Sequence, residues 1–192
     1  MLKKTLLATA TTAALLGPVA AFAAGEFGQG TITFTGSIIE APCSISAADS
    51  ALNIDLGQIS RKDLVGTGKF SASVPITIHL TGCSFEADTG AGANANGKLS
   101  KVGVSFAGTT SDAAKGMLTN TGNAANVAVQ ILGKDNATAV NFNTAPTAAT
   151  AQQLTAGNTN VLNFFARLAS TAATGVTAGT VSSSVTYTLT YF

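Results

Sequence analysis

The residues with the most specific chemistry in this chain are its two cysteines, Cys43 and Cys83. In a protein exported to an oxidising compartment, an even and minimal cysteine count indicates a disulfide bond. A metal site is the alternative, but two sulfurs without clustered histidines are too few ligands for a structural zinc ion. We therefore expect a Cys43–Cys83 disulfide, whose loop of about 40 residues would contribute roughly 3.5–4 kcal/mol in the chain-entropy model.

Catalytic chemistry has few candidate residues in the sequence. His79 is the only histidine, and it falls on the strand face opposite Ile76, Ile78 and Leu80, where a solvated or edge position is expected. No nucleophile elbow, zinc-protease motif, P-loop or dinucleotide fingerprint accompanies it. Most carboxylates adjoin turn residues, which predicts solvated loop acids at Asp49, Asp55, Asp63, Asp88, Asp112 and Asp135. We therefore predict a protein that is not an enzyme and needs no metal or cofactor.

An export signal precedes the elements that must position these residues. Lys3 and Lys4 stand before an apolar run from Thr5 to Leu16, and Ala21-Phe22-Ala23 provides the small residues that signal peptidase requires. The apolar run is shorter than the roughly 20 residues of a membrane span, so we expect cleavage after Ala23 rather than an anchor. We expect the mature chain to be one domain without a membrane span.

The composition favours an all-β protein. Charged residues make up 10% of the chain, which is too little for the basic field that nucleic-acid binding needs. No long apolar stripe with the helical period is present, whereas short β-branched and aromatic runs recur between turn-forming stretches. The predicted strands are Leu52–Ile59, Val74–Leu80, Val102–Phe106, Val127–Leu132, Val140–Phe142 and Val161–Leu168. An antiparallel β-sandwich fits this pattern.

Two further strands are predicted near the ends of the chain. From Val181 to Phe192, apolar and small polar residues alternate strictly, and the apolar face consists of Val181, Val185, Tyr187, Leu189 and Tyr191, with Ser183 as its only polar member. The strand carries neither charge nor proline to protect its edge from pairing with another chain. A similar face near the amino terminus consists of Ile32, Phe34, Gly36 and Ile38. The pattern predicts a chain that lends one strand and borrows another.

Four segments of the chain are informative when taken together: Gly28-Gln-Gly-Thr-Ile-Thr-Phe-Thr-Gly36, the following Ser-Ile-Ile-Glu-Ala-Pro-Cys43-Ser-Ile45, Leu56-Gly-Gln-Ile59 and Leu80-Thr-Gly-Cys83. They resemble segments of chaperone–usher fimbrial subunits, the type 1 and P pilus major pilins of Gram-negative bacteria. The family's penultimate tyrosine is matched by Tyr191, and a glycine before the last strand is matched by Gly179. Ser183 departs from the family pattern because it is polar within an apolar face, and Phe192 stands where many relatives end in a polar residue.

The resemblance implies an incomplete immunoglobulin-like β-sandwich that lacks its final strand and is completed by donor-strand exchange. It implies three parts: a signal peptide at 1–23, an amino-terminal donor-strand extension at 24–39 and a pilin domain at 40–192. The donor strand, roughly Gly28 to Ile39, would present Ile32, Phe34, Gly36 and Ile38. The strand that lines the groove and meets the chaperone would present Gly179, Val185, Tyr187, Leu189 and Tyr191.

The resemblance also implies a role as a structural subunit of an adhesive fimbria on the cell surface. A periplasmic chaperone would deliver the subunit to an outer-membrane usher, where it would join identical or homologous pilins. Gly36 would then allow close backbone approach in a shallow pocket, although a bulge or bend is an alternative reason for a glycine there. Three other roles stay open: a minor adaptor or terminator subunit, an adhesive tip subunit, and a self-contained secreted β-sandwich that acts as an enzyme or binding protein.

Overall fold

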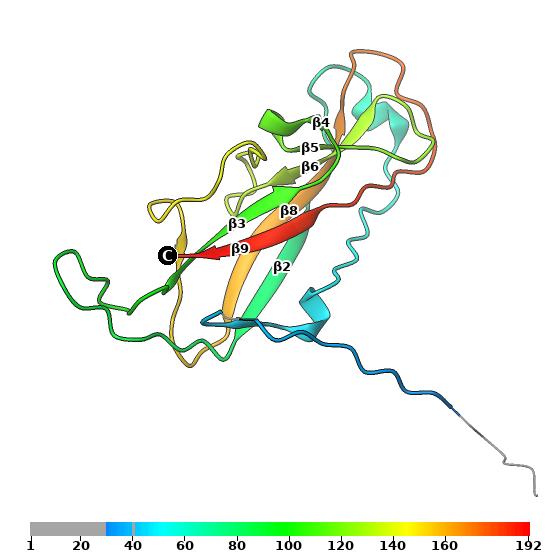
Figure 1. The fold of residues 1–192 in the computed structure, drawn as a ribbon. Helices are drawn as coiled ribbons and strands as arrows, with labels where there is room; N and C mark the ends of the chain where they lie inside the picture. Colours follow the sequence, from blue (N-terminus) through cyan, green and yellow to red (C-terminus); the bar gives the residue numbers. More distant parts are fainter. Residues whose placement is uncertain (1–29, 40) are drawn as a thin grey trace, which may run out of the picture. The chain divides into compact units, whose positions relative to one another are not determined.

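The computed structural model describes residues 30–39 and 41–192. The expected signal peptide, the start of the expected donor strand and Glu40 lie outside the described residues. The chain divides into two units, the first ending at Ile38 and the second running from Ile39 to Phe192, and each is described by itself. The described residues of the first unit form no strand or helix (Figure 1). Their large apolar side chains are exposed.

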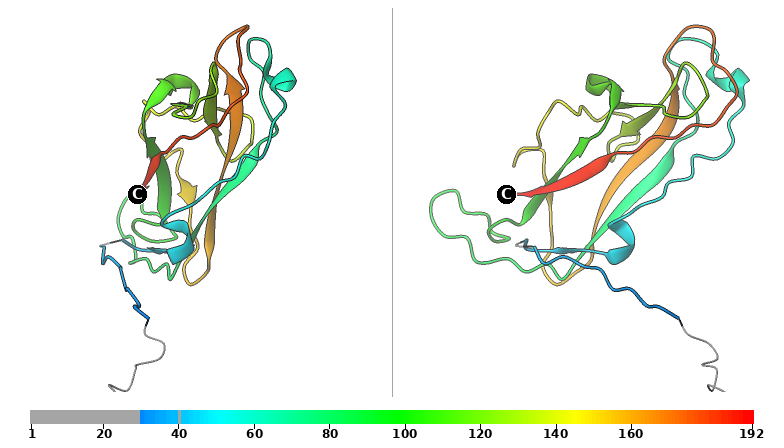
Figure 2. Two further views of the ribbon diagram at one scale, coloured as in Figure 1. Left: turned by 90° about the vertical axis from the view of Figure 1, so that its right-hand side faces the viewer. Right: turned by 45° about the vertical axis from the view of Figure 1, so that its right-hand side comes forward.

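The second unit is an antiparallel β-sandwich. Among the described residues, one sheet has six strands in the order β1-β2-β8-β6-β5-β4, and the other has three in the order β7-β3-β9. Figure 2 shows them as two layers, with β9 in red and β3 in green on one side and β8 in orange and β2 in turquoise on the other. No helix in this part of the chain is long and apolar enough to cross a membrane.

The strands and short 3-10 helices alternate with loops along the whole unit. Up to residue 119 lie β1 (Ser44–Ile45), η1 (Ala47–Asp49), η2 (Arg61–Leu64), β2 (Val74–Thr81), β3 (Lys101–Ala107), β4 (Thr110–Asp112), η3 (Ala113–Lys115) and β5 (Met117–Thr119). They are followed by β6 (Val127–Leu132), β7 (Gln152–Gln153), β8 (Asn160–Ser170) and β9 (Thr186–Tyr191).

Alternating side chains place the core between the two sheets. On β2, Ile76, Ile78 and Leu80 are buried, and β8 pairs with it in antiparallel register so that Ile78 lies opposite Leu162. Burial of such side chains is the main favourable contribution to folding. On the other sheet, β3 pairs with β9, and Val104 lies opposite Leu189.

The core consists of two clusters that meet near Phe164, whose ring contacts Phe106 edge-on with centroids 5.0 Å apart. We call the first the disulfide cluster; it comprises Cys43, Ile78, Leu80, Cys83, Val102, Leu154 and Leu162. The second, the groove cluster, comprises Leu64, Ile76, Phe106, Leu118, Ala124, Val127, Val129, Ile131, Ala166, Leu168 and Val176.

The predicted strands are confirmed where the sheet provides a neighbouring strand on both sides. The runs at 74–80, 102–106, 127–132 and 161–168 all lie within strands. The predictions for Leu52–Ile59 and Val140–Phe142 are wrong, because neither segment forms a ladder. Of Val181–Phe192, only Thr186–Tyr191 is a strand. The described residues of the predicted donor strand, 30–39, form no strand in this chain.

Candidate functional site: an apolar groove beside the last strand

A groove opens the sandwich along one side of the second unit. Its cavity volume is about 870 Å³. One wall is the segment Leu52–Ile59, the other is the segment 176–185 that leads into β9, and side chains of the groove cluster form the floor. Asp55 and Arg61 are the charged residues in its lining. The groove therefore exposes part of the hydrophobic core that a complete sandwich would cover.

The first wall is an extended segment without a sheet partner. Leu52, Ile54 and Leu56 are half-buried in alternation with exposed neighbours. Gly57 then adopts a φ of +72°, a conformation that glycine takes readily, and its amide donates a hydrogen bond of 2.8 Å to the Asp55 carboxylate. This turn brings Ile59 back to the inner side. Among the described residues, 51–59 make no backbone–backbone hydrogen bond, so this wall has unpaired peptide groups.

In the second wall and β9, the backbone peptide groups make hydrogen bonds along one edge only. Lys101 and Phe192 exchange two backbone hydrogen bonds of 2.9 and 3.0 Å, so the alternation of an antiparallel ladder directs the even-numbered peptide groups of β9 towards β3. Before β9, Thr180 and Ser182 accept hydrogen bonds from loop 119–125 with their carbonyl groups. The odd-numbered peptide groups from Val181 onwards therefore point to the opposite edge, which has no partner strand in the described chain.

Gly179 and Ser183 fix the second wall to the loop at 119–125. A Cβ atom at Gly179 would lie 2.7 Å from the Ala124 amide nitrogen and would overlap the Asn123 side chain, so only glycine allows this approach. The Ser183 hydroxyl donates a hydrogen bond of 2.8 Å to the Thr119 carbonyl. The polar residue in the apolar face thus has a structural partner within its own chain.

The predicted groove residues separate into two sets. Gly179 and Val185 line the groove. Tyr187, Leu189 and Tyr191 lie further along the same face, where they pack against the disulfide cluster rather than line the cavity. Burial raises the pKa of both tyrosine hydroxyls above the usual value, so they stay protonated at neutral pH.

The predicted donor residues are exposed in the first unit. The exposed fraction is 78% for Ile32, 88% for Phe34 and 103% for Ile38. A Cβ atom at Gly36 would have no neighbour within 4 Å. The donor role of this segment stays a prediction, since it concerns a second chain.

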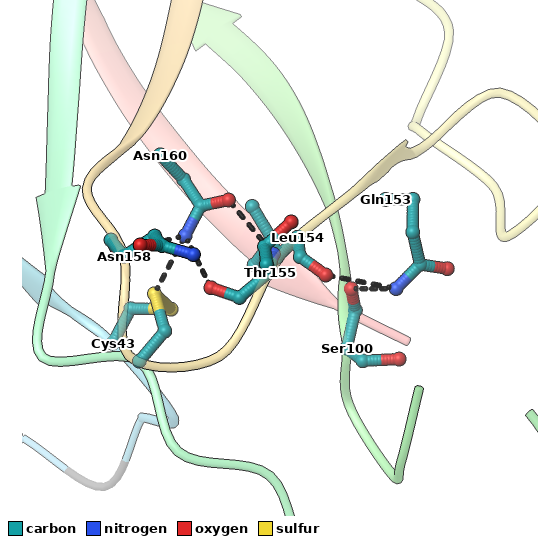
Figure 3. The surroundings of a disulfide bond; sticks show 8 residues. Cys43, Ser100, Gln153, Leu154, Thr155, Asn158 and Asn160 are labelled. Atoms are coloured by element: carbon teal, nitrogen blue, oxygen red, sulfur yellow. Dashed lines mark hydrogen bonds between the residues drawn. A yellow bond between two sulfur atoms is a disulfide. The ribbon is translucent and has the colours of Figure 1, made fainter. Parts of the chain in front are cut away.

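The disulfide joins Cys43 and Cys83, both of which are buried. The Asn160 side chain donates hydrogen bonds to the Cys83 sulfur at 3.3 Å and to the Thr155 carbonyl at 3.0 Å. Figure 3 shows Asn160, Asn158 and Thr155 gathered beside the bridge, where they fold the loop before β8 over it. The bridge therefore ties the segment that follows the predicted donor to the end of β2.

One cluster of residues was not predicted from the sequence. Asp49 was expected to be a solvated loop acid, and this is wrong: only 5% of it is exposed. Its carboxylate accepts hydrogen bonds from the His79 backbone amide at 2.6 Å and faces the His79 ring nitrogen at 2.8 Å. The Asp49 carbonyl accepts a hydrogen bond of 2.9 Å from the Tyr187 hydroxyl. No motif signals this contact, because Asp49 and Tyr187 lie 138 residues apart in the sequence.

The His79 ring itself lies where the sequence predicts. Its side chain is 43% exposed, on the opposite face of β2 from Ile78 and Leu80. The pKa of the Asp49 carboxyl lies below its usual value, mainly because the carboxylate accepts the hydrogen bond from the His79 backbone amide. In the part of the chain that the structure describes, no three His, Cys, Asp or Glu side chains gather as metal ligands.

The comparisons with known proteins agree with this architecture. The family model described as "Fimbrial protein" matches residues 32–191. The chain is 37% identical to the uncharacterized fimbrial-like protein YbgD of Escherichia coli K12, over 98% of this chain and 97% of YbgD. It is 34% identical to the Pap fimbrial major pilin protein of Escherichia coli, over 85% of this chain and 84% of the pilin.

Solved structures of pilus subunits are also similar to this chain. A chain from a chaperone–usher pilus structure superposes with a TM-score of 0.66 at 30% identity, over 86% of this chain and 97% of that one. The P pilus rod subunit PapA superposes with a TM-score of 0.61 at 28% identity, over 79% of this chain and all of PapA. Since the family model and both relatives cover most of the sequence, this chain belongs to the fimbrial protein family.

Proposed function

We propose that this structural fimbrial subunit polymerises by accepting an extended strand from a neighbouring subunit into the groove. The observation that carries the proposal is the pair of groove walls, which face an apolar floor and both have unpaired peptide groups. An extended peptide placed between them would form ladder hydrogen bonds on both of its edges, each worth about 1 kcal/mol net. Its inward side chains would cover the exposed part of the core.

The donor in this proposal is the segment from Gly28 to Ile39 of the next subunit. Burial of Ile32, Phe34 and Ile38 would contribute about 1.5–3 kcal/mol each, or about 4.5–9 kcal/mol together, before the cost of ordering the segment. At about 3.3 Å per residue, an extended stretch from 32 to 38 is about 23 Å long, and the extended part of the wall from 52 to 56 is about 17 Å long before the turn at Gly57. The donor face and the groove are both apolar, and the donor is long enough to cover the extended part of the wall.

The chaperone and the usher enter this proposal from the family resemblance, and the groove supplies a physical reason for the chaperone. Because apolar side chains of the core line an open groove, a chaperone strand is expected to occupy it until an outer-membrane usher brings the next donor. A donor-strand extension at 24–39 and a pilin sandwich domain at 40–192 are the functional parts in this scheme. Coverage of PapA along its whole length and of the Pap major pilin over 84% supports a rod-forming subunit. A purely structural role also leaves no need for an enzymatic activity.

A fused donor strand tests the proposal. A flexible linker and a copy of residues 28–39 are added after Phe192, and the matched control carries Phe34→Asp in the copy alone. The fusion should be a soluble monomer without a chaperone, because the copy docks at high effective concentration. Size exclusion and thermal unfolding measure the outcome. A chain that is already a stable monomer without the copy, and gains nothing from it, would refute the proposed function.

A further inference from the structure

The hydrogen bond between Tyr187 and Asp49 joins the segment just before the first groove wall to the segment just after the second. Asp49 ends the 3-10 helix that leads into the first wall at Leu52, and Tyr187 follows Val185, the last groove-lining residue of the second wall. The Tyr187 hydroxyl donates to the Asp49 carbonyl at 2.9 Å. This contact therefore spans the sandwich where the open half meets the closed half.

The partners of this hydrogen bond are held in place from both sides. The carboxylate of Asp49 is fixed to β2 by the backbone amide and the ring of His79, at 2.6 and 2.8 Å. The ring of Tyr187 packs against both core clusters, as does Leu52. A rigid aromatic ring between two fixed ends sets the distance between the walls in a way that a flexible side chain would not.

We propose that the Tyr187–Asp49 hydrogen bond is a cross-tie that keeps the two groove walls one strand apart before any strand enters. Strands pair at about 4.7–4.9 Å, so an inserted strand needs walls roughly 9.5 Å apart. Without a tie, the same apolar floor that attracts a donor also favours collapse of the walls onto each other. Holding the groove open in advance lowers the ordering cost of strand capture. The inference rests on the proposed function and specifies Tyr187 as a positioning residue.

The chain provides its own control for this inference. Tyr191 lies on the same face of β9 and is also partly buried, but its hydroxyl has no hydrogen-bond partner in the described chain. Tyr187→Phe and Tyr191→Phe therefore make the same chemical change on the same strand. Only Tyr187→Phe removes the hydrogen bond between the two segments that border the walls.

The test measures how fast the groove captures a donor peptide. The oxidised mature chain carries Phe34→Asp, so that its own donor does not compete, and is diluted from denaturant directly into a solution of a fluorescent synthetic peptide of residues 28–39, because an empty groove is not expected to persist. The capture rate constant and the unfolding temperature are measured for this parent chain and for each tyrosine variant. Tyr187→Phe should slow capture about two- to tenfold, in line with the loss of one hydrogen bond, and Tyr191→Phe should leave it within twofold.

Each outcome separates the cross-tie from the proposed function. Slower capture with Tyr187→Phe alone supports the cross-tie. Equal capture rates for both variants, or a lower unfolding temperature of Tyr187→Phe with an unchanged capture rate, would reduce Tyr187 to a packing role and overturn it. Failure of the parent chain itself to capture the peptide would overturn the proposed function, and the cross-tie with it.

Discussion

Removal of the disulfide should destabilise the sandwich, and the length of the loop between the two cysteines sets the size of the loss. Cys43 and Cys83 are 40 residues apart, and a loop of this length corresponds to about 4 kcal/mol of unfolded-state entropy in the chain-entropy model. In the double variant Cys43→Ala/Cys83→Ala, Asn160 loses the sulfur but keeps the Thr155 carbonyl as a hydrogen-bond acceptor. The loss should therefore come mainly from the freed loop.

The assay uses the subunit with the fused donor strand, so that an incomplete groove does not dominate the result. For a domain of this size, about 4 kcal/mol corresponds to a fall in Tm of roughly 8–16 °C. The denaturant slope should rise as well, because the unfolded chain without a cross-link exposes more surface. Reduction of the unsubstituted protein serves as a second route to the same state.

Two results would contradict this reasoning. A double variant that unfolds within about 2 °C of the parent would show that the loop between the cysteines is already constrained in the unfolded chain. A large fall in Tm with an unchanged denaturant slope would place the effect in the native state instead. The amount of each variant in the periplasm should follow the measured stability, since proteins this close to their stability threshold are removed when destabilised.

Three further substitutions test the groove, the donor and the buried carboxylate. Gly179→Ala should lower the stability of the fused subunit by about 1–3 kcal/mol in denaturant titrations, because its Cβ would crowd the Ala124 amide. Phe34→Asp should allow export but block fibre formation, as counted by electron microscopy, because a charge cannot enter an apolar groove. The Asp49 carboxyl has a lowered pKa, so its stabilising contribution is full above about pH 4 and is lost as the pH falls through the lower folded value. Asp49→Asn should therefore flatten the acid dependence of Tm below pH 4.

Matched variants control for these effects. Gly30→Ala adds a methyl group where nothing lies within 4 Å, so loss of stability there as large as at Gly179 would contradict the crowding argument. Thr33→Asp places the same charge on the opposite face of the donor, and loss of fibres with both variants would refute the assigned phase. If Asp49→Asn leaves the pH dependence of Tm below pH 4 unchanged, the titrating group must be another residue.

The sequence predicts the faces of the strands better than their partners. Alternation places Ser183 on the inner side of the last segment, and the structure confirms this, because side-chain direction depends only on neighbouring backbone. The ladder, however, begins only at Thr186, since β3 ends there and a loop takes over. The segment at 52–59 alternates like a strand, but no other strand of the described chain pairs with it. It forms a wall of the groove instead.

The candidate site was predicted only in part for a related physical reason. Gly179 and Val185 line the groove, and their part in strand capture stays a prediction. Asp49 was missed because its burial depends on His79 in β2 and on Tyr187 near the end of the chain. Contacts of such long sequence separation form only when the topology is complete, and no local pattern encodes them.

The position of the disulfide also determines how the subunit would carry tension. The predicted donor residues precede Cys43 in the chain, so a pull along a fibre assembled through them would reach the sandwich at this cysteine. The covalent bridge passes the force directly to Cys83 at the end of β2, which is paired with β8 along seven residue pairs. The first groove wall, Leu52–Ile59, lies inside the loop that the bridge closes. Force that enters at Cys43 would therefore reach β2 without running along this wall, and in the proposed fibre only the strand bound in the groove would load the wall.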